Sequence, residues 1–91
     1  MNKENKLVKR NIELSTEFSR YIFEHPEIEK MIPIGTEIIL LPEYDKELKE
    51  FNLKLGKEIE TEGEKVVYIK IMGIRPKALS RIEKVELASV I

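Results

Sequence analysis

Two acidic residues, Glu43 and Asp45, are the side chains of this chain that could support metal-dependent chemistry. Carboxylate oxygens are the ligands that Mg²⁺ prefers, and both residues follow a run of strand-forming residues that ends at Leu41. Open α/β sheets bind their ligands at the carboxyl ends of the strands. One hypothesis is therefore a small Mg²⁺-dependent hydrolase or nuclease that uses Glu43 and Asp45.

A structural interpretation accounts for the same two residues more simply, and we favour it. Asp45 directly precedes a predicted helix and is a good N-cap residue. Glu43 is expected to pair with Arg75 or Lys77, which follow the second predicted strand at the same edge of the sheet. On this interpretation the chain has no catalytic residue, no metal site and no cofactor.

The single histidine, His25, gives little support for catalysis. One histidine excludes a multi-histidine metal site within one chain, and no serine and aspartate are obvious partners for a triad. His25 lies at the end of a predicted long helix, where the dipole favours a cation, and Pro26 fixes the turn beside it. We therefore predict a structural, helix-terminating role.

A modest basic cluster near the C-terminal end consists of Arg75, Lys77, Arg81 and Lys84. Glu83 and Glu86 interrupt this cluster, and no aromatic residues for base stacking are interleaved with it. Weak RNA binding is an alternative function, although we do not expect a nucleic-acid partner.

The composition narrows the classes of function. Sixteen Lys and Arg residues against seventeen Asp and Glu residues give no overall field that would steer the chain to nucleic acid or to an anionic membrane. The absence of cysteine excludes disulfides and thiolate metal sites. The charged first residues lack the apolar core of a signal peptide, and the apolar runs are too short to span a bilayer. We expect a cytoplasmic protein. The high Glu content, with one Asp and no Gln, Cys or Trp, is typical of proteins from hot-living organisms.

Residues 36–72 have the pattern of a βαβ unit. Strand formers at 37–41 and 65–71 flank an amphipathic helix at 46–62, which Gly63 ends. Such a crossover is nearly always right-handed and makes the two strands parallel. Both strands are almost continuously apolar, so we expect burial on both faces of the sheet.

The remaining elements complete one α/β (α+β) domain over residues 1–91. A long helix at 1–24, beginning near residue 3, precedes a short helix at 26–31. In the tail, 73–91, the residues from Val85 onward alternate between apolar and polar, which predicts a third, edge strand. A helix over 77–84 is the alternative there. The predicted order is α, β, α, β, β, with helices packed on a small three-stranded sheet.

The first helix carries an apolar arc of about 200°, roughly twice the width that one core contact needs. At about 33 Å, it is also longer than a strand of about 20 Å. We therefore predict a symmetric homodimer contact, with an unidentified protein partner as the alternative. The interface residues would be Leu7, Val8, Asn11, Ile12, Ser15 and Ser19. A simpler interpretation is that the small polar residues Asn11, Ser15 and Ser19 are tolerated at the margin of the core.

The chain resembles a family of small prokaryotic proteins, about 90 residues long, that is known as a domain of unknown function. The resemblance covers most of the chain up to about residue 72 and rests on Asn11-Ile12-Glu13-Leu14, Glu17-Phe18-Ser19-Arg20-Tyr21, His25-Pro26-Glu27, Ile32-Pro33 with Gly35, Leu40-Leu41-Pro42, Asn52, and Gly63 before Val66-Val67. These are mainly turn, cap and core residues, so the resemblance implies no activity. Our leading hypothesis is a non-catalytic, homodimeric interaction module of unknown role.

Overall fold

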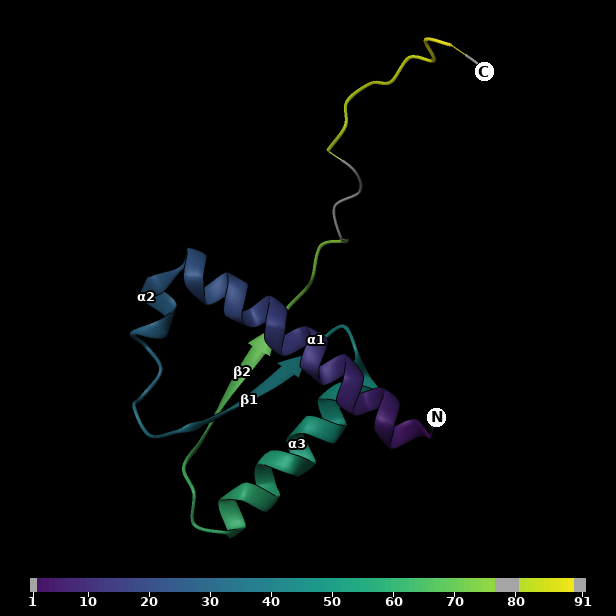
Figure 1. The fold of residues 1–91 in the computed structure, drawn as a ribbon. Helices are drawn as coiled ribbons and strands as arrows, with labels where there is room; N and C mark the ends of the chain where they lie inside the picture. The colour runs from purple at the N-terminus through teal and green to yellow at the C-terminus, as the bar shows by residue number, and fades with distance from the viewer. Residues whose placement is uncertain (1, 77–80, 90–91) are drawn as a thin grey trace.

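The computed structural model describes residues 2–76 and 81–89 of the chain (Figure 1). Within them the elements follow the order α1 (Lys3–Glu24), α2 (Pro26–Glu29), β1 (Glu37–Pro42), α3 (Lys46–Thr61) and β2 (Val66–Ile71). This is a small α+β fold. The predicted long helix, the short helix after His25 and the βαβ unit are all present, with boundaries within a few residues of those expected.

The sheet of the described residues contains two parallel strands. β1 pairs with β2 in a register that sets Glu37 opposite Val66 and Pro42 opposite Ile71, which confirms the parallel βαβ prediction. The predicted third strand is wrong for the described part of the tail, because residues 81–89 are exposed and contain neither strand nor helix. Residues 77–80, on which part of the alternative helix falls, and residues 90–91 lie outside the described residues.

Pro42 belongs to β1, although the sequence placed the end of the strand at Leu41. The amide groups of Glu37 and Glu43 both face β2 and donate to the carbonyl oxygens of Lys65, which directly precedes β2 (2.8 Å), and of Ile71 (2.9 Å). Successive residues of a strand direct their backbone groups to opposite sides, so the nitrogen of Pro42 faces away from β2. A proline is tolerated there because that side needs no donor.

Capping residues define the ends of α1 and α3, and those predicted at Asp45, Gly63 and His25 are present. Oδ1 of Asp45 accepts a hydrogen bond from the amide of Leu48 at the start of α3 (3.2 Å), and Gly63 follows the end of α3 with a φ of 89°. That left-handed conformation favours glycine because it lacks a Cβ atom. At α1, Asn2 is the N-cap and His25 is the C-cap.

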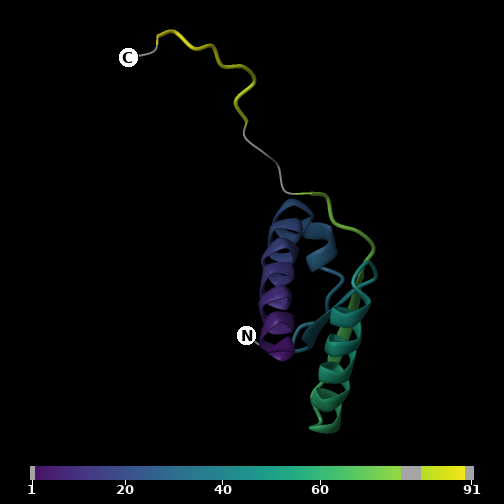
Figure 2. The ribbon, with the colours of Figure 1, turned by 90° about the vertical axis from the view of Figure 1, so that its right-hand side faces the viewer.

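The two long helices cover different faces of the sheet (Figure 2). On one face, Leu7 and Leu14 of α1 form a buried cluster with Leu40 of β1 and Leu48 at the start of α3. Partly buried residues pack against this cluster, namely Phe18, Phe51, Ile69 and Ile71. On the other face, Gly56 of α3 lies against the ring of Tyr68. Helices therefore lie on both faces of the sheet, but the expected burial is reached only in β1, at residues 39–42, whereas the residues of β2 are half-buried or exposed.

Asn52 of α3 is the most buried polar residue described, with 1% of its surface exposed. Its Nδ2 donates to the carbonyl oxygen of Leu40 on β1 (2.8 Å) and to Oδ1 of Asn11 on α1 (2.9 Å). Its own Oδ1 has no partner among the described residues. One amide group therefore connects α1, α3 and β1 at the centre of the fold.

Substitutions of Asn52 should test this connection. Asn52→Leu should lower the free energy of unfolding by about 1–3 kcal/mol, because the buried carbonyl oxygen of Leu40 and the partly buried Oδ1 of Asn11 lose their donor. Asn52→Asp should cost more, since it also buries a carboxylate beside two oxygen atoms. Urea denaturation at neutral pH measures both losses. The control is Asn5→Asp, the same change at an exposed site of α1, which should alter stability by less than about 0.5 kcal/mol. Equal effects of Asn52→Asp and Asn5→Asp would contradict the assignment.

The contact between Gly56 and Tyr68 predicts that the effect of Gly56→Ala on stability changes sign when Tyr68 is replaced. A Cβ atom on Gly56 would lie 2.6 Å from Cε1 and 2.7 Å from the hydroxyl oxygen of Tyr68, so Gly56→Ala should destabilise the protein by about 1 kcal/mol despite the better helix propensity of alanine. In a Tyr68→Val background, the same substitution should stabilise it by about 1 kcal/mol. A double-mutant cycle measured by urea denaturation checks this, and additive effects would refute the contact.

Candidate functional site

The loop between β1 and α3 contains the predicted metal-binding candidates, Glu43 and Asp45, and both carboxylates contact basic side chains. Oδ1 of Asp45 caps α3, and its Oδ2 lies 3.1 Å from Nη1 of Arg10. Glu43 forms an ion pair with Lys49 of α3 and lies 3.9 Å from Nζ of Lys70 on β2. The cap role predicted for Asp45 is confirmed.

Of the two partners predicted for Glu43, Arg75 was wrong and Lys77 is not tested. Lys49 and Lys70 occupy the place proposed for Arg75, and the other proposed partner, Lys77, lies outside the described residues. Lys49 is one turn into α3 and returns toward the loop, while Lys70 is directed there by the register of β2. Hydrogen bonding to Lys49, together with the charges of Lys49 and Lys70, lowers the pKa of Glu43 below 4.5.

Arg10 of α1 connects that helix to the start of α3. Its Nη1 contacts Asp45, and its Nη2 donates to Oε1 of Glu47 at 2.6 Å. Lys3 adds a second cation, with Nζ 3.0 Å from Oε2 of Glu47. The hydrogen bonds from Lys3 and Arg10 lower the pKa of Glu47 below its ordinary value. These charges hold the N-terminal half of α1 against the positive end of the α3 dipole, which the two carboxylates also favour.

The arrangement therefore favours structural ion pairing over metal ligation. A cation at Glu43 and Asp45 would have to displace Lys49 and Arg10, which already neutralise those carboxylates. Across residues 2–76 and 81–89, no three His, Cys, Asp or Glu side chains lie together as a metal site would require. Burial and the nearby carboxylate of Asp45 raise the pKa of Tyr44 above 10, so its hydroxyl stays protonated near neutral pH.

His25 has the helix-terminating position that the sequence predicted. Its amide donates to the carbonyl oxygens of Tyr21 (2.9 Å) and Ile22 (3.2 Å) at the end of α1. The imidazole stacks on the ring of Tyr21, with a centroid separation of 4.2 Å, and Nδ1 lies 3.3 Å from Oε1 of Glu27. The ring and backbone of His25 thus order the turn into α2.

The predicted interface residues of α1 separate into two groups. Leu7 is buried in the core and Asn11 bonds to Asn52, so these two residues face the protein interior and their assignment to an outer interface was wrong. The others remain on the surface, namely Val8, Ile12, Ser15 and Ser19. The two groups differ because α1 is rotated so that only one half of its wide apolar arc meets the sheet.

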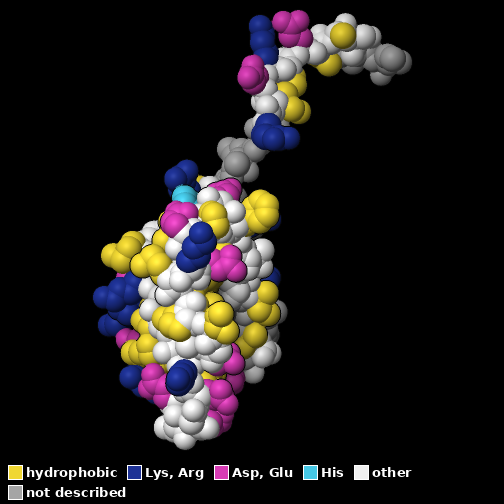
Figure 3. Space-filling view, turned by 90° about the vertical axis from the view of Figure 1, so that its left-hand side faces the viewer, with side chains coloured by type: hydrophobic (Ala, Val, Ile, Leu, Met, Phe, Trp, Pro, Cys, Tyr) yellow, Lys and Arg dark blue, Asp and Glu magenta, His cyan; other side chains and the backbone are white. Residues whose placement is uncertain are grey.

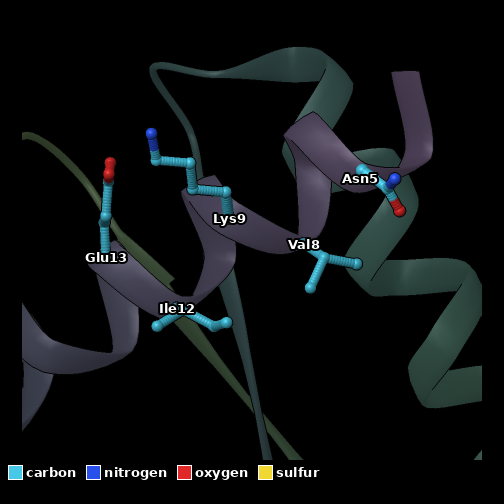
Figure 4. A pocket seen from close by; sticks show the side chains of 5 residues that line it. All are labelled: Asn5, Val8, Lys9, Ile12 and Glu13. Atoms are coloured by element: carbon cyan, nitrogen blue, oxygen red, sulfur yellow. The ribbon is translucent and has the colours of Figure 1, made fainter. Parts of the chain in front are cut away.

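The exposed half of that arc forms a stripe along α1, which we call the outer face and define by Val8, Ile12, Ser15, Ser19 and Phe23. Val8, Ile12 and Phe23 are 44%, 62% and 88% exposed. In Figure 4, Val8 and Ile12 project from the same side of the helix, whereas Lys9 and Glu13 point elsewhere. These four side chains and Asn5 line a shallow hollow. In Figure 3, hydrophobic side chains form several groups between charged ones on one face of the molecule.

Two residues that organise this region were difficult to identify from the sequence. Arg10 lay in the polar arc of the first helix, and nothing in its spacing indicated contacts 35 and 37 residues away. Asn52 was visible as a polar residue at the border of an apolar stripe. That position was the one available signal for a buried hydrogen-bonding role.

The comparisons with known proteins agree with the resemblance seen in the sequence. Residues 6–85 match a family of unknown function, DUF5647, and the chain belongs to that family. The search of curated proteins and the search of solved structures returned no match. None of the described helices is both long enough and apolar enough to cross a bilayer.

The ion pairs predict how stability depends on pH. Because Glu43 and Glu47 have lowered pKa values in the folded state, their stabilising contribution is complete above the ordinary value of 4.5. It is lost as the pH falls through the lowered folded values. Urea midpoints measured between pH 7 and about pH 2.5 should decrease over that lower range. Lys49→Gln should reduce this dependence by removing the main partner of Glu43.

Lys54→Gln is the matched control, since Lys54 is an exposed lysine of α3 that makes no ion pair within the described residues. It should leave the pH profile like that of the unmodified protein. Identical profiles for Lys49→Gln and the unmodified protein would exclude a contribution from the Glu43 ion pair.

Proposed function

We propose that this protein is a non-catalytic interaction module that forms a homodimer through the outer face of α1. The observation that carries the proposal is the exposure of three apolar side chains along that face, with Val8 and Ile12 on its N-terminal half and Phe23 at its C-terminal end. Contiguous apolar surface on a small domain usually marks an interaction site. A domain of 91 residues also has a modest core, so association would add to its stability.

The arrangement of the outer face suits a two-fold symmetric helix pair. Ser15 lies near the middle of the stripe, between Val8 and Phe23. If two copies of α1 crossed antiparallel with the axis near Ser15, Val8 of one copy would approach Phe23 of the other. Ile12 would then approach Ser19. Such an interface is self-complementary, as an isologous dimer requires.

The two serines fit the middle of such an interface. Ser15 and Ser19 are exposed and short, so they would allow the helix backbones to approach closely. The hydroxyl of Ser19 already donates to the carbonyl oxygen of Ser15 (3.1 Å). Burying Ser19 in an interface would therefore not leave its hydroxyl donor unsatisfied.

The alternative functions lack a comparable observation. Glu43 and Asp45, the residues of the hydrolase hypothesis, both contact basic side chains. In the described part of the basic tail, Lys84 lies 3.5 Å from Glu86 and is partly neutralised. The interaction module therefore remains the function that the described geometry supports best.

Ile12→Glu should dissociate the proposed dimer. Each copy contributes one Ile12, so the substitution removes two apolar side chains and places two carboxylates in the interface. Loss of about 1.5–3 kcal/mol for each buried isoleucine predicts a weakening of association by at least about a hundredfold. Light scattering across a dilution series measures the molar mass, and circular dichroism verifies the fold.

The matched control is Leu53→Glu, which makes the same kind of change at an exposed leucine of α3, outside the outer face. It should leave the mass of the dimer unchanged. A mass of 10.7 kDa for the unmodified protein at every concentration would overturn the proposal. So would equal dissociation by Ile12→Glu and Leu53→Glu.

A further inference from the structure

The two outer edges of the sheet differ in how they are closed. On β1, the outward carbonyl oxygen of Leu40 accepts from Asn52, and the outward nitrogen of Pro42 has no hydrogen to donate. Lys65, directly before β2, and Ile71, at its end, direct their carbonyl oxygens to β1. Alternation then directs the backbone groups of Val66, Tyr68 and Lys70 outward. Within residues 2–76 and 81–89, no further strand covers that edge.

The two paired strands also differ in burial, and β2, whose outer edge is open, is the less buried of the two. Ile39, Leu40 and Leu41 of β1 are buried, whereas their register partners on β2, residues 68–70, are half-buried or exposed. Strands of parallel sheets are usually covered on both faces. The apolar side chains of β2 therefore lack a neighbour on the open side of the sheet, which is the side where an added strand would supply one.

The C-terminal tail has the composition of such a strand. Val85 and Leu87 are 78% and 82% exposed, and Glu86 lies between them, so a strand here would have one apolar side and one polar side. The match to the family extends through residue 85, so the first part of this segment lies within the region that defines the family.

We propose that the tail of a second copy of this chain pairs with the open edge of β2. Val85 and Leu87 then extend the apolar face formed by Ile69 and Ile71 beneath α1. Glu86 lies on the opposite face, beside the exposed ammonium group of Lys70. Backbone hydrogen bonds to an open edge supply affinity, and the alternating side chains supply specificity. Exchange between two copies also covers an edge that would otherwise invite unspecific pairing.

A second copy fits the geometry better than the chain's own tail. Residues 72–84 separate β2 from Val85, so a hairpin loop, which usually has about two to five residues, does not join the tail to β2 of its own chain. Figures 1 and 2 show the described tail leading away from the sheet of its own chain. The edge of β2 and the outer face of α1 are separate surfaces, so this inference does not rest on the proposed α1 dimer.

Engineered cysteines in the full chain test the pairing, because the chain has no cysteine of its own. Side chains of directly opposed residues on neighbouring strands have Cβ atoms about 4.5–5.5 Å apart, which is close enough for disulfide formation after small shifts. Protein with Glu86→Cys is mixed with protein carrying Val66→Cys, Tyr68→Cys or Lys70→Cys in turn, which covers the possible registers. Lys54→Cys, on α3, replaces the β2 variant in the control mixture.

We expect oxidation to give a heterodimeric disulfide at least about tenfold more abundant with one β2 variant than with Lys54→Cys. Val85→Pro and Ala88→Pro, made separately in the Glu86→Cys chain, place proline at positions whose amides face opposite sides of the strand. One of the two should reduce this yield, because a proline on the side of β2 cannot donate to the added ladder. A yield no higher than that of the control, for all three β2 positions, would overturn the proposal. In the double variant Lys70→Cys/Glu86→Cys, a disulfide formed within one chain would also overturn it, since the occupant would then be the chain's own tail.

A further variant separates the two interfaces. Ile12→Glu introduced into both members of the cysteine pair should leave the disulfide yield unchanged at high protein concentration, because it alters only the outer face of α1. Loss of cross-linking with this variant would show that tail pairing depends on the α1 dimer and would overturn the independence of the two surfaces.

Discussion

The buried amide of Asn52 is the constraint on which the rest of this structure depends. A polar group with 1% exposure is stable in a core only when its donors are satisfied, and both partners of Asn52 lie on other elements. Leu40 fixes the position of α3 along the edge of β1, and Asn11 fixes the rotation of α1 about its own axis. Because Asn11 must face α3, Leu7 and Leu14 are directed into the core.

The same rotation determines which surface the protein presents. At 100° per residue, Val8 and Ile12 lie well to one side of Asn11 and Leu7, so they remain exposed when Asn11 faces inward. Arg10 lies on the opposite side and reaches the start of α3. One helix therefore has three sides: an apolar stripe for its own core, an ion-pairing side that holds α3, and an outer face whose apolar side chains are exposed.

The carboxyl edge of the sheet illustrates how location alone can mislead. Enzymes with open α/β sheets place their chemistry at this edge, yet Glu43, Asp45 and Glu47 are all paired with basic side chains from three different elements. The lowered pKa values of Glu43 and Glu47 follow from these ion pairs. The ion pairs at this edge join the two long helices, which have few other contacts with each other.

The sequence by itself determined the local elements: the βαβ unit, the parallel strands, the Asp45 cap, the Gly63 stop and the double width of the apolar arc on α1. Each depends on residues close together in the chain, whose propensities and spacing are readable without a fold. Only the tertiary structure decided which half of the arc is buried, since periodicity gives angles between residues but not the rotation of a helix against its neighbours. Leu7 and Asn11 were misassigned for that reason. The partners of Arg10 and Glu43, and the absence of a strand in the described tail, likewise depended on contacts between distant segments, which local spacing does not encode.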